Sequence, residues 1–555
     1  MRKSSYPGLL VLRIAASMQR FDLSSVIRFS IIQLFSIAQL HWRRWVATWM
    51  VMALLWSGVA PSALAQINPG TANAGTANPG TDIQPYIDGV VNRITEFTLD
   101  NGMKFIVMER HQAPVISFMT YVDVGAAEEE DGKTGVAHYL EHLAFKGTTR
   151  IGTANYEAEA PLLDRLDELF AEIRAAEQAG QADKVVELQQ EFQQVQAEAA
   201  QYVKQNEYGQ IVDQSGGVGL NATTSADATR YFYSFPANKL ELWMSLESER
   251  FLEPVFREFH EEREVILEER RTRTDNSPIG KMIEEFLGAA LQGQPYGRPV
   301  IGYEQDIRNI TREDIQEFFD TYYTPDHIIA AIVGDVDPDR VKELAEAYFG
   351  RYQARSPVPP LEVIPPERTE PKEVIVEFPS QPWYMQGYQR PAITSPDNQV
   401  YNVIAGLLTS GRTSRLYKSL IESQLALNAN IAPTFPGDRF TNVMLIYALT
   451  APNHTVDDIA TVMNAELERL KTEPVLAEEL DRVKTQTRAS LLQTLASNQG
   501  MASLLPEYEA KTGSWRNLFE DLKRLEAVTA EDVQRVAQEL FQPQNLTVGK
   551  LLPAG

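Results

Sequence analysis

The pattern of hydrophobic and polar positions predicts that the body of the chain begins with strands and continues into a short helix. Ile94–Leu99 and Lys104–Met108 are rich in strand-favouring residues and flank the sequence Asp-Asn-Gly, which is typical of a hairpin turn. Val115–Val124 predicts a third strand. Gly135–Gly147 is bounded by glycines and has no internal proline, so it predicts a short helix with Thr134 near its start as a cap.

A longer helical period runs through residues 161–205. Glu, Gln, Ala and Arg fill the gaps between apolar residues at helical spacing, and the pattern breaks at Ala179-Gly180. The apolar positions are Leu163, Leu166, Phe170 and Ile173 before the break, and Val185, Leu188, Phe192, Val195 and Tyr202 after it. We expect two antiparallel helices, a protruding hairpin that acts as a spacer or as a docking arm.

An internal repeat predicts two similar halves. Residues 310–325 align without a gap on residues 528–543, at an offset of 218. The shared positions are Thr311/Thr529, Glu313/Glu531, Asp314/Asp532, Gln316/Gln534 and Pro325/Pro543. In both copies a Thr-capped helix leads to a turn at proline and then to an apolar strand. We therefore expect an α+β fold built from two homologous halves, with the helical hairpin inserted in the first half.

Composition sets the limits of each segment. We assign residues 1–65 to an export leader, 66–90 to a flexible linker rich in Gly, Thr, Ala and Asn, and 91–355 to the first half. Residues 356–372 form a Pro-rich linker, and 373–553 form the second half.

The leader predicts that the protein is exported to the periplasm or the cell envelope. Arg43-Arg44 precede the apolar run Trp45–Ala60, and Ala63-Leu64-Ala65 is a cleavage site of the A-x-A type. The mature chain would then begin near Gln66. The alternative is an uncleaved leader that anchors the protein in a membrane.

Charge and cysteine content narrow the chemistry. The chain has a formal net charge of −24 although its leader is basic, and this acidity argues against nucleic acid as a partner. It contains no cysteine, so any zinc site must use His, Asp or Glu.

The predicted short helix carries the residues of a metal site. His138 and His142 are four residues apart and lie on one helical face, and Glu141 shares that face. Two imidazoles that converge in this way are natural zinc ligands, and the carboxylate beside them can take a proton from water. The order H-x-x-E-H is the inverse of the thermolysin-type motif.

A third ligand is expected in the acidic segment that begins at Phe259. Glu262 and Glu269 are two helical turns apart on one face. Periodicity alone does not choose among the candidates, which are Glu261, Glu262, Glu264, Glu268 and Glu269.

Several motifs together resemble a known family. They are His138-Tyr-Leu-Glu-His142, Glu262-Arg-Glu-Val-Ile-Leu-Glu-Glu269, Leu99-Asp-Asn-Gly102, Asn221-Ala-Thr-Thr224, Tyr323-Thr-Pro325 with Gly334-Asp335, and Ser414-Arg-Leu-Tyr417. With these motifs the chain resembles the insulysin/pitrilysin family of inverse-motif zinc metallopeptidases. The branch concerned contains mitochondrial processing peptidase and bacterial two-subunit relatives.

The resemblance implies a role for each site residue. Glu269 becomes the third ligand of one zinc ion per chain, beside His138 and His142, and Glu262 helps to orient the site. Glu141 becomes the general base. Asn221 and Ala222 fall on an edge strand that binds peptide substrate as an added strand. The family fold has two halves, each an antiparallel sheet packed with helices, around a closed chamber.

Two departures from the family pattern matter. The spacing from His142 to Glu269 is longer than usual, which the insertion at 161–205 explains. In the second half, the positions of an Arg and a Tyr that help to bind substrate are occupied by Ile421 and Asn428. We therefore expect a homologous subunit that supplies the Arg and Tyr in a heterodimer, with a homodimer as the alternative.

These observations favour a zinc-dependent peptidase that hydrolyses unfolded or short peptides with metal-activated water. The alternative is a non-catalytic structural or assembly subunit of a peptidase-like complex.

Overall fold

The computed structural model of the chain describes residues 84–354, 358–366 and 368–554. All of these residues belong to one compact unit. The predicted leader lies outside the described residues. Among the described residues, no helix has both the length and the apolar character needed to cross a membrane. Residues 84–90, which we assigned to the linker, form helix α3 (Gln84–Val91), whose Ile87 and Val90 are buried.

Six strands form the sheet of the first half, in the order β1-β2-β6-β3-β5-β4. All neighbours are antiparallel except β2 and β6, and β4 lies at an edge. The strands are β1 (Ile94–Thr98), β2 (Lys104–Glu109), β3 (Val115–Val122), β4 (Val218–Thr224), β5 (Thr229–Pro236) and β6 (Ile328–Gly334). In the predicted turn between β1 and β2, Gly102 has a φ of 98°, a value that glycine adopts without strain.

Helices cover the first sheet and form its core. On one face Phe118 stacks on Trp243 of α8 with 4.5 Å between ring centroids. Besides α3, the helices of this half are α4 (Val136–Leu143), α5 (Tyr156–Gln178), α6 (Ala182–Ala199), α7 (Glu207–Gln214), α8 (Leu240–Leu252), α9 (Phe259–Arg270), α10 (Pro278–Ala290), α11 (Glu304–Asn309), α12 (Arg312–Tyr322) and α13 (Pro338–Tyr348).

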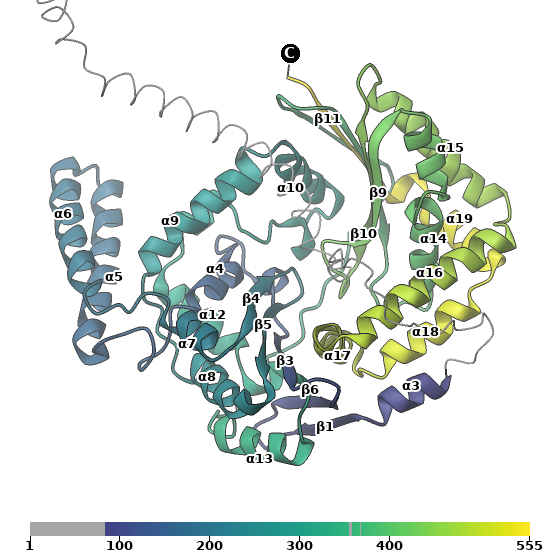
Figure 1. Cartoon of the computed structure of the whole chain (residues 1–555). Coiled ribbons are helices and arrows are strands. Elements are labelled where there is room, and N and C mark those ends of the chain that lie inside the picture. The colour runs from purple at the N-terminus through teal and green to yellow at the C-terminus, as the bar shows by residue number, and fades with distance from the viewer. Residues whose placement is uncertain (1–83, 355–357, 367, 555) are drawn as a thin grey trace, which may run out of the picture. The chain divides into compact units, whose positions relative to one another are not determined.

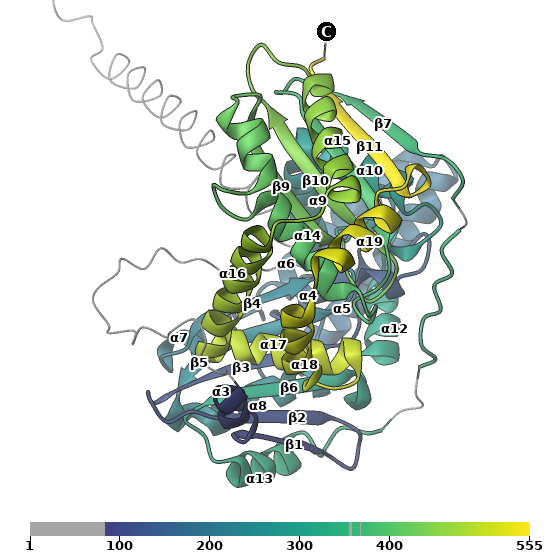
Figure 2. The ribbon, with the colours of Figure 1, turned by 90° about the vertical axis from the view of Figure 1, so that its right-hand side faces the viewer.

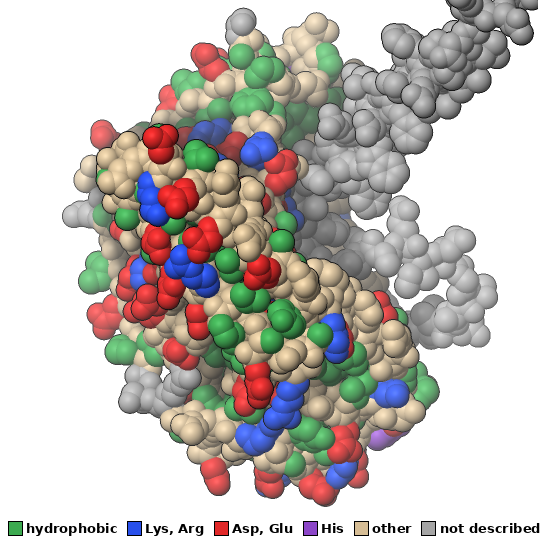
Figure 3. Space-filling view, turned by 90° about the vertical axis from the view of Figure 1, so that its left-hand side faces the viewer, with side chains coloured by type: hydrophobic (Ala, Val, Ile, Leu, Met, Phe, Trp, Pro, Cys, Tyr) green, Lys and Arg blue, Asp and Glu red, His purple; other side chains and the backbone are tan. Residues whose placement is uncertain are grey.

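Helices α5 and α6 pair in the region where the sequence predicts a helical hairpin (Figure 1). Their paired faces enclose a small core of Leu169, Ala176 and Leu188. Acidic side chains are frequent on the side of the molecule on which these helices lie (Figure 3). Each of the two helices turns its apolar face toward the other, so the outer surface of the pair is polar.

The second half has a sheet of five strands in the order β7-β11-β8-β10-β9. Here too only one pair, β7 and β11, is parallel. The strands are β7 (Lys372–Glu377), β8 (Trp383–Arg390), β9 (Ala426–Phe435), β10 (Asn442–Thr450) and β11 (Leu546–Leu552). The helices are α14 (Asn398–Thr409), α15 (Val456–Thr472), α16 (Ala477–Ala496), α17 (Asn498–Thr512), α18 (Asn517–Ala527) and α19 (Ala530–Leu540).

The sequence repeat corresponds to a repeat in structure. Thr311 and Thr529 begin α12 and α19, and each forms a capping box with the aspartate three residues later. Each helix then leads through a turn at proline to a central strand, β6 or β11, at the same offset of 218 residues. The predicted α+β fold with two similar halves is confirmed.

The two halves exchange a helix. Helix α10 of the first half packs on β7 and β11 of the second sheet, and α17 of the second half packs on β3 and β6 of the first (Figures 1 and 2). Gly387 and Gly549 permit the close approach of α10, because a Cβ at either position would overlap Phe286 or Met282. Each sheet is therefore completed by the other half.

A buried network of charges also joins the halves. Lys511 of α17 forms ion pairs with Asp227, Asp438 and Glu507. Burial alone would lower the pKa of Lys511, but the carboxylates around it outweigh this effect and raise the pKa. Arg439 of the second half also pairs with carboxylates of the first, Asp123 and Glu128.

Candidate metal centre

Helix α4 begins deep in the first half and presents the two histidines. Its N-cap is Gly135 with a φ of 92°, and not Thr134 as the sequence suggests. A Cβ at Gly135 would lie 2.7 Å from the carbonyl oxygen of Ile301. Glycine is therefore required both by the positive φ and by this close contact. Thr134 instead donates a hydrogen bond to Asp306, at 2.6 Å.

A buried carboxylate takes the place of the expected threonine cap. The two oxygens of Glu129 accept hydrogen bonds from the backbone N–H groups of Gly135 and Ala137, at 2.9 and 3.0 Å. Burial raises the pKa of Glu129 to about 8 although these hydrogen bonds favour its charged form. The start of α4 is thus fixed from outside the helix.

The structure brings His138, His142 and Glu269 together. Their possible ligand atoms all lie within 4.8 Å of one another, and among the described residues no other group of this kind occurs. The Nε2 atoms of His138 and His142 lie 3.8 and 3.5 Å from the two carboxylate oxygens of Glu269. The two imidazole rings stand edge to face with centroids 4.8 Å apart, as the one-turn spacing predicts.

Glu269 belongs to the last turn of α9, and an irregular segment follows it. Arg271–Asp275 form a π-helix, a form that often occurs at functional sites. Arg273 in this segment forms an ion pair of 2.5 Å with Glu269. Helix α10 begins just beyond the π-helix, so the second sheet helps to position the segment that holds Glu269.

Glu262 lies behind His142. One of its oxygens is 3.0 Å from Nδ1 of His142, and the other is 2.5 Å from the ammonium group of Lys146. A hydrogen bond to Nδ1 fixes the tautomer that leaves Nε2 free to bind a metal. Nδ1 of His138 is buried and has no hydrogen-bond partner among the residues that the structure describes.

The surroundings of the site shift the pKa values of the two histidines in opposite directions. Burial lowers the pKa of His138 to about 4, which keeps the imidazole neutral. Burial would also lower the pKa of His142, but hydrogen bonds with Glu262 and Glu269 outweigh it and raise the value to about 9. For Glu269, burial would raise the pKa, but His142, His138 and Arg273 together lower it to about 2.

Glu141 is directed toward the edge strand. Its carboxylate accepts a hydrogen bond of 2.6 Å from the hydroxyl group of Thr224, at the end of β4. Burial raises its pKa, and the hydrogen bond with Thr224 opposes that shift only in part. A raised pKa makes a carboxylate a better proton acceptor at neutral pH.

The donor set is chemically suited to zinc. Two imidazole nitrogens and one carboxylate are a usual set for a catalytic zinc, which keeps a further position open. Neutral His138 and ionised Glu269 already have the protonation states that metal binding requires. His142 has a raised pKa, so a metal cation would displace a proton from it.

The remaining predicted residues lie on the strands and helices of both halves. Asn221 and Ala222 are on β4, where they pair with Phe232 and Tyr231 of β5. Ile421 lies in the second π-helix, Tyr417–Glu422, and Asn428 lies on β9 at the edge of the second sheet. Sequence reasoning missed Glu129, Lys146, Thr224 and Arg273.

Comparison with known families matches both halves of the chain. The profile described as Insulinase (Peptidase family M16) matches residues 104–162 and 199–304. The profile described as Peptidase M16 inactive domain matches residues 309–487. Together the two matches cover more than half of the chain. The chain belongs to the insulinase family, peptidase family M16.

Individual members of the M16 family agree with this assignment. The zinc protease PqqE of Helicobacter pylori is 29% identical over 469 residues, which are 82% of this chain and 92% of that protein. The mitochondrial-processing peptidase subunit beta of Neurospora crassa is 24% identical over 512 residues, 88% of this chain and 92% of that protein. The crystal structure of a protease from Helicobacter pylori superposes with a TM-score of 0.70 at 28% identity, covering 83% of this chain and 99% of that one.

The family predicted from the motifs is therefore confirmed. The M16 profile passes over residues 163–198, which are most of the α5–α6 hairpin. Residues 163–198 are thus an insertion relative to that profile. The second half, residues 373–553, contains a single histidine, His454.

We expect Gly280→Ala in α10 to destabilise the chain by about 1–3 kcal/mol and to weaken zinc binding. A Cβ at this position would overlap the carbonyl oxygen of Arg273 in the π-helix, so the segment after Glu269 must shift. Gly288→Ala on the same helix is the control, because the nearest atom to its Cβ is 3.9 Å away. It should stabilise the helix by up to about 1 kcal/mol. Thermal unfolding and titration with a zinc chelator measure both effects, and equal behaviour of the two variants would contradict the expectation.

Proposed function

We propose that this protein is a zinc-dependent peptidase of the cell envelope. The convergence of His138, His142 and Glu269, with Glu141 beside them, carries this proposal. Zinc in such a set acts as a Lewis acid on a peptide carbonyl and makes water a better nucleophile near neutral pH. One ion per chain is expected, because at the repeat offset Glu262 and Glu269 correspond to Leu480 and Thr487.

Each residue has a separate task in this proposal. His138, His142 and Glu269 hold the metal, and Glu262 orients the imidazole of His142 through Nδ1. Glu141 accepts the proton of the attacking water and later passes it to the leaving amine. The hydroxyl group of Thr224 holds the carboxylate of Glu141 in place.

The edge strand supports a peptide as the substrate. Strand β4 lies at an edge of the first sheet, and its end at Thr224 is in contact with Glu141. An extended peptide added beside Asn221 and Ala222 would therefore run toward the proposed base. Backbone pairing tolerates many side chains, so unfolded or short peptides in a closed chamber fit better than folded proteins.

A second subunit fits what the chain lacks. Hydrolysis generates an oxyanion, and donors such as Arg or Tyr stabilise it. The Arg position holds Ile421, which has no hydrogen-bond donor, and the Tyr position holds Asn428, which has a neutral amide in place of a phenol. The similar protein of Neurospora crassa is named as a subunit, beta, of a peptidase. A heterodimer with a homologous Arg- and Tyr-bearing chain is thus favoured over a homodimer.

We expect the isolated chain to bind zinc but to hydrolyse peptides at well below about 1 per second, the lower end of common enzyme rates. Addition of the homologous Arg- and Tyr-bearing chain from the same organism should raise the rate by orders of magnitude. Peptide cleavage, with zinc content measured in parallel, is the assay. Ordinary rates from the chain alone would rule out the need for a second subunit. Zinc binding without cleavage in the mixture would favour a structural or assembly role.

A further inference from the structure

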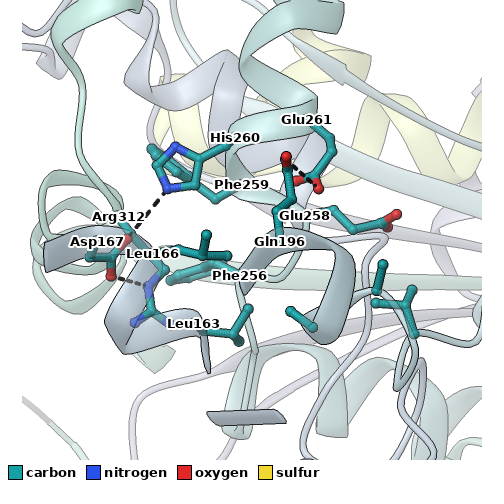
Figure 4. A pocket seen from close by; sticks show the side chains of 13 residues that line it. Leu163, Leu166, Asp167, Gln196, Phe256, Glu258, Phe259, His260, Glu261 and Arg312 are labelled. Atoms are coloured by element: carbon teal, nitrogen blue, oxygen red, sulfur yellow. Dashed lines mark hydrogen bonds and ion pairs between the residues drawn. The ribbon is translucent and has the colours of Figure 1, made fainter. Parts of the chain in front are cut away.

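The inner end of the α5–α6 hairpin packs on the first turn of α9. The rings of Phe170 on α5 and Phe192 on α6 lie 5.3 and 4.9 Å from the imidazole of His260, measured between centroids. His260 is 9% exposed. Figure 4 shows it above the hairpin, where Asp167 lies 3.8 Å from its Nε2 atom. Helix α9 is the helix that carries Glu262 and Glu269.

The aromatic contacts continue from α9 to α4. Phe259 packs against His260 at 5.0 Å and stacks on Tyr139 at 4.8 Å, with only 7° between the ring planes. The hydroxyl group of Tyr139 donates a hydrogen bond to the carbonyl of Phe259. Tyr139 stands between His138 and His142 in α4. We call this series of five side chains, Phe170, Phe192, His260, Phe259 and Tyr139, the aromatic bridge.

Polar contacts close the rim of the aromatic bridge. Arg263 lies 4.2 Å above the ring of Phe170 and donates a hydrogen bond to the carbonyl of Ile310, at 2.8 Å. Gln196 of α6 donates a hydrogen bond of 2.7 Å to Glu261 on α9 (Figure 4). The hairpin is therefore fixed to α9 on both sides of the bridge.

The residues that precede α9 are held in the same way. Arg257 is fully buried and pairs with Glu159 of α5, and its other N–H groups donate to backbone carbonyls near the end of α4. Glu258, the N-cap of α9, has a φ of 54°, which is unfavourable for a residue with a side chain. Its carboxylate contacts Gln205 and Lys146, at 2.5 and 3.2 Å. These contacts stabilise the unfavourable backbone conformation at the start of α9.

We propose that the α5–α6 hairpin braces the metal centre, with Phe170 and Phe192 as positioning residues. The proposal rests on the proposed function, because it takes Glu262 and Glu269 as parts of a zinc site. Glu262 lies less than one turn beyond His260, and its 3.0 Å contact with His142 orients the metal site. Without the two rings, the first turn of α9 would lose its cover and fray, and this contact would loosen.

Two members of the aromatic bridge lie outside the residues that the M16 profile matches. Phe170 and Phe192 both lie within residues 163–198, which the M16 profile does not match. The other three members of the aromatic bridge lie outside that gap. The inserted hairpin thus covers aromatic groups that belong to the family part of the fold.

Phe192→Ala in the full chain tests the brace. We expect about a tenfold weaker affinity for zinc by chelator competition, and faster hydrogen exchange at the backbone amides of the first turns of α9. The visible spectrum of the cobalt(II) form should change as well. Phe192→Tyr retains the ring, and its added hydroxyl group can reach solvent because Phe192 is only half-buried. It should restore all three properties.

Leu188→Ala is the matched control. Leu188 lies one turn further out on α6 and packs in the hairpin's own core. Its removal should speed exchange in α5 and α6 and leave zinc affinity and the exchange of α9 unchanged. Unchanged zinc affinity and α9 exchange in Phe192→Ala would overturn the brace.

Two further outcomes are separable. If Phe192→Ala does not fold, Gln196→Ala, which removes only the contact with Glu261, should speed exchange in α9, and no change there would count against the brace. If the unaltered chain binds no zinc, the proposed function fails, and the exchange of α9 amides in the same variants still decides whether the hairpin holds this helix.

Discussion

Glu141→Gln is expected to lower peptide hydrolysis by about 10²–10⁴-fold while zinc stays bound. The amide keeps the size of the side chain and can still contact Thr224, but it cannot accept a proton from water. Glu141 lies beside the group of possible ligands and not within it, so the metal site should keep its composition. Turnover of a peptide together with the zinc content of the same preparation is the measurement.

The control for this variant is a glutamate of the same kind away from the cluster. Glu264→Gln lies on the exposed side of α9 and removes one negative charge from the helix that also carries Glu269. It should cleave peptides at the unaltered rate. Near-normal turnover by zinc-loaded Glu141→Gln, measured with the partner chain present, would remove Glu141 from its assigned role.

His138→Ala and Glu269→Gln are expected to lose most of their zinc. Each removes one of three ligands, so the loss of affinity should exceed the 10–100-fold that is common when an orienting residue behind a ligand is changed. Glu262→Gln should fall within that smaller range, because Glu262 contacts His142 rather than the metal position. Elemental analysis and chelator competition on the three variants give a graded series.

His454→Ala serves as the control for this series, because His454 lies in the second half and outside the cluster. It should bind zinc like the unaltered chain. Full retention of zinc in His138→Ala or Glu269→Gln would refute the ligand assignment, whatever the activity.

Features that depend on neighbours in the sequence could be predicted from it. The pairing of His138 with His142 follows from one helical turn, and the caps at Thr311 and Thr529 follow from residues three positions away. Thr134 shows the limit of this reasoning. It has the type of a cap, but Asp306 binds its hydroxyl group, and Glu129 caps the helix instead.

Features that depend on distant segments could not be predicted. Five glutamates of α9 are equivalent by periodicity, and only the fold brings Glu269 to the histidines and Glu262 behind one of them. Thr224 contacts Glu141 across 83 residues of sequence, and no local pattern signals that contact. The family resemblance supplied the choice of glutamates, which physical reasoning from the sequence left open.

For the helical hairpin, the sequence predicts the two helices but not their contacts with the rest of the fold. Apolar spacing indicates two antiparallel helices, and it includes Phe170 and Phe192 among the residues of their common face. The pattern does not show that these two rings turn toward His260. A spacer and a docking arm were the alternatives, and the contacts with α9 point to a third role.

The exchange of α10 and α17 makes each half of this protein depend on the other for folding. A duplicated sequence suggests two modules that once folded separately. Here each sheet is finished by a helix encoded in the other repeat, and the buried ammonium group of Lys511 would lose its ion pair with Asp227 if the repeats were parted. The two halves defined by the sequence repeat are therefore not expected to fold when they are separated. The two repeats are therefore mutually dependent, because neither sheet keeps its covering helix without the other repeat.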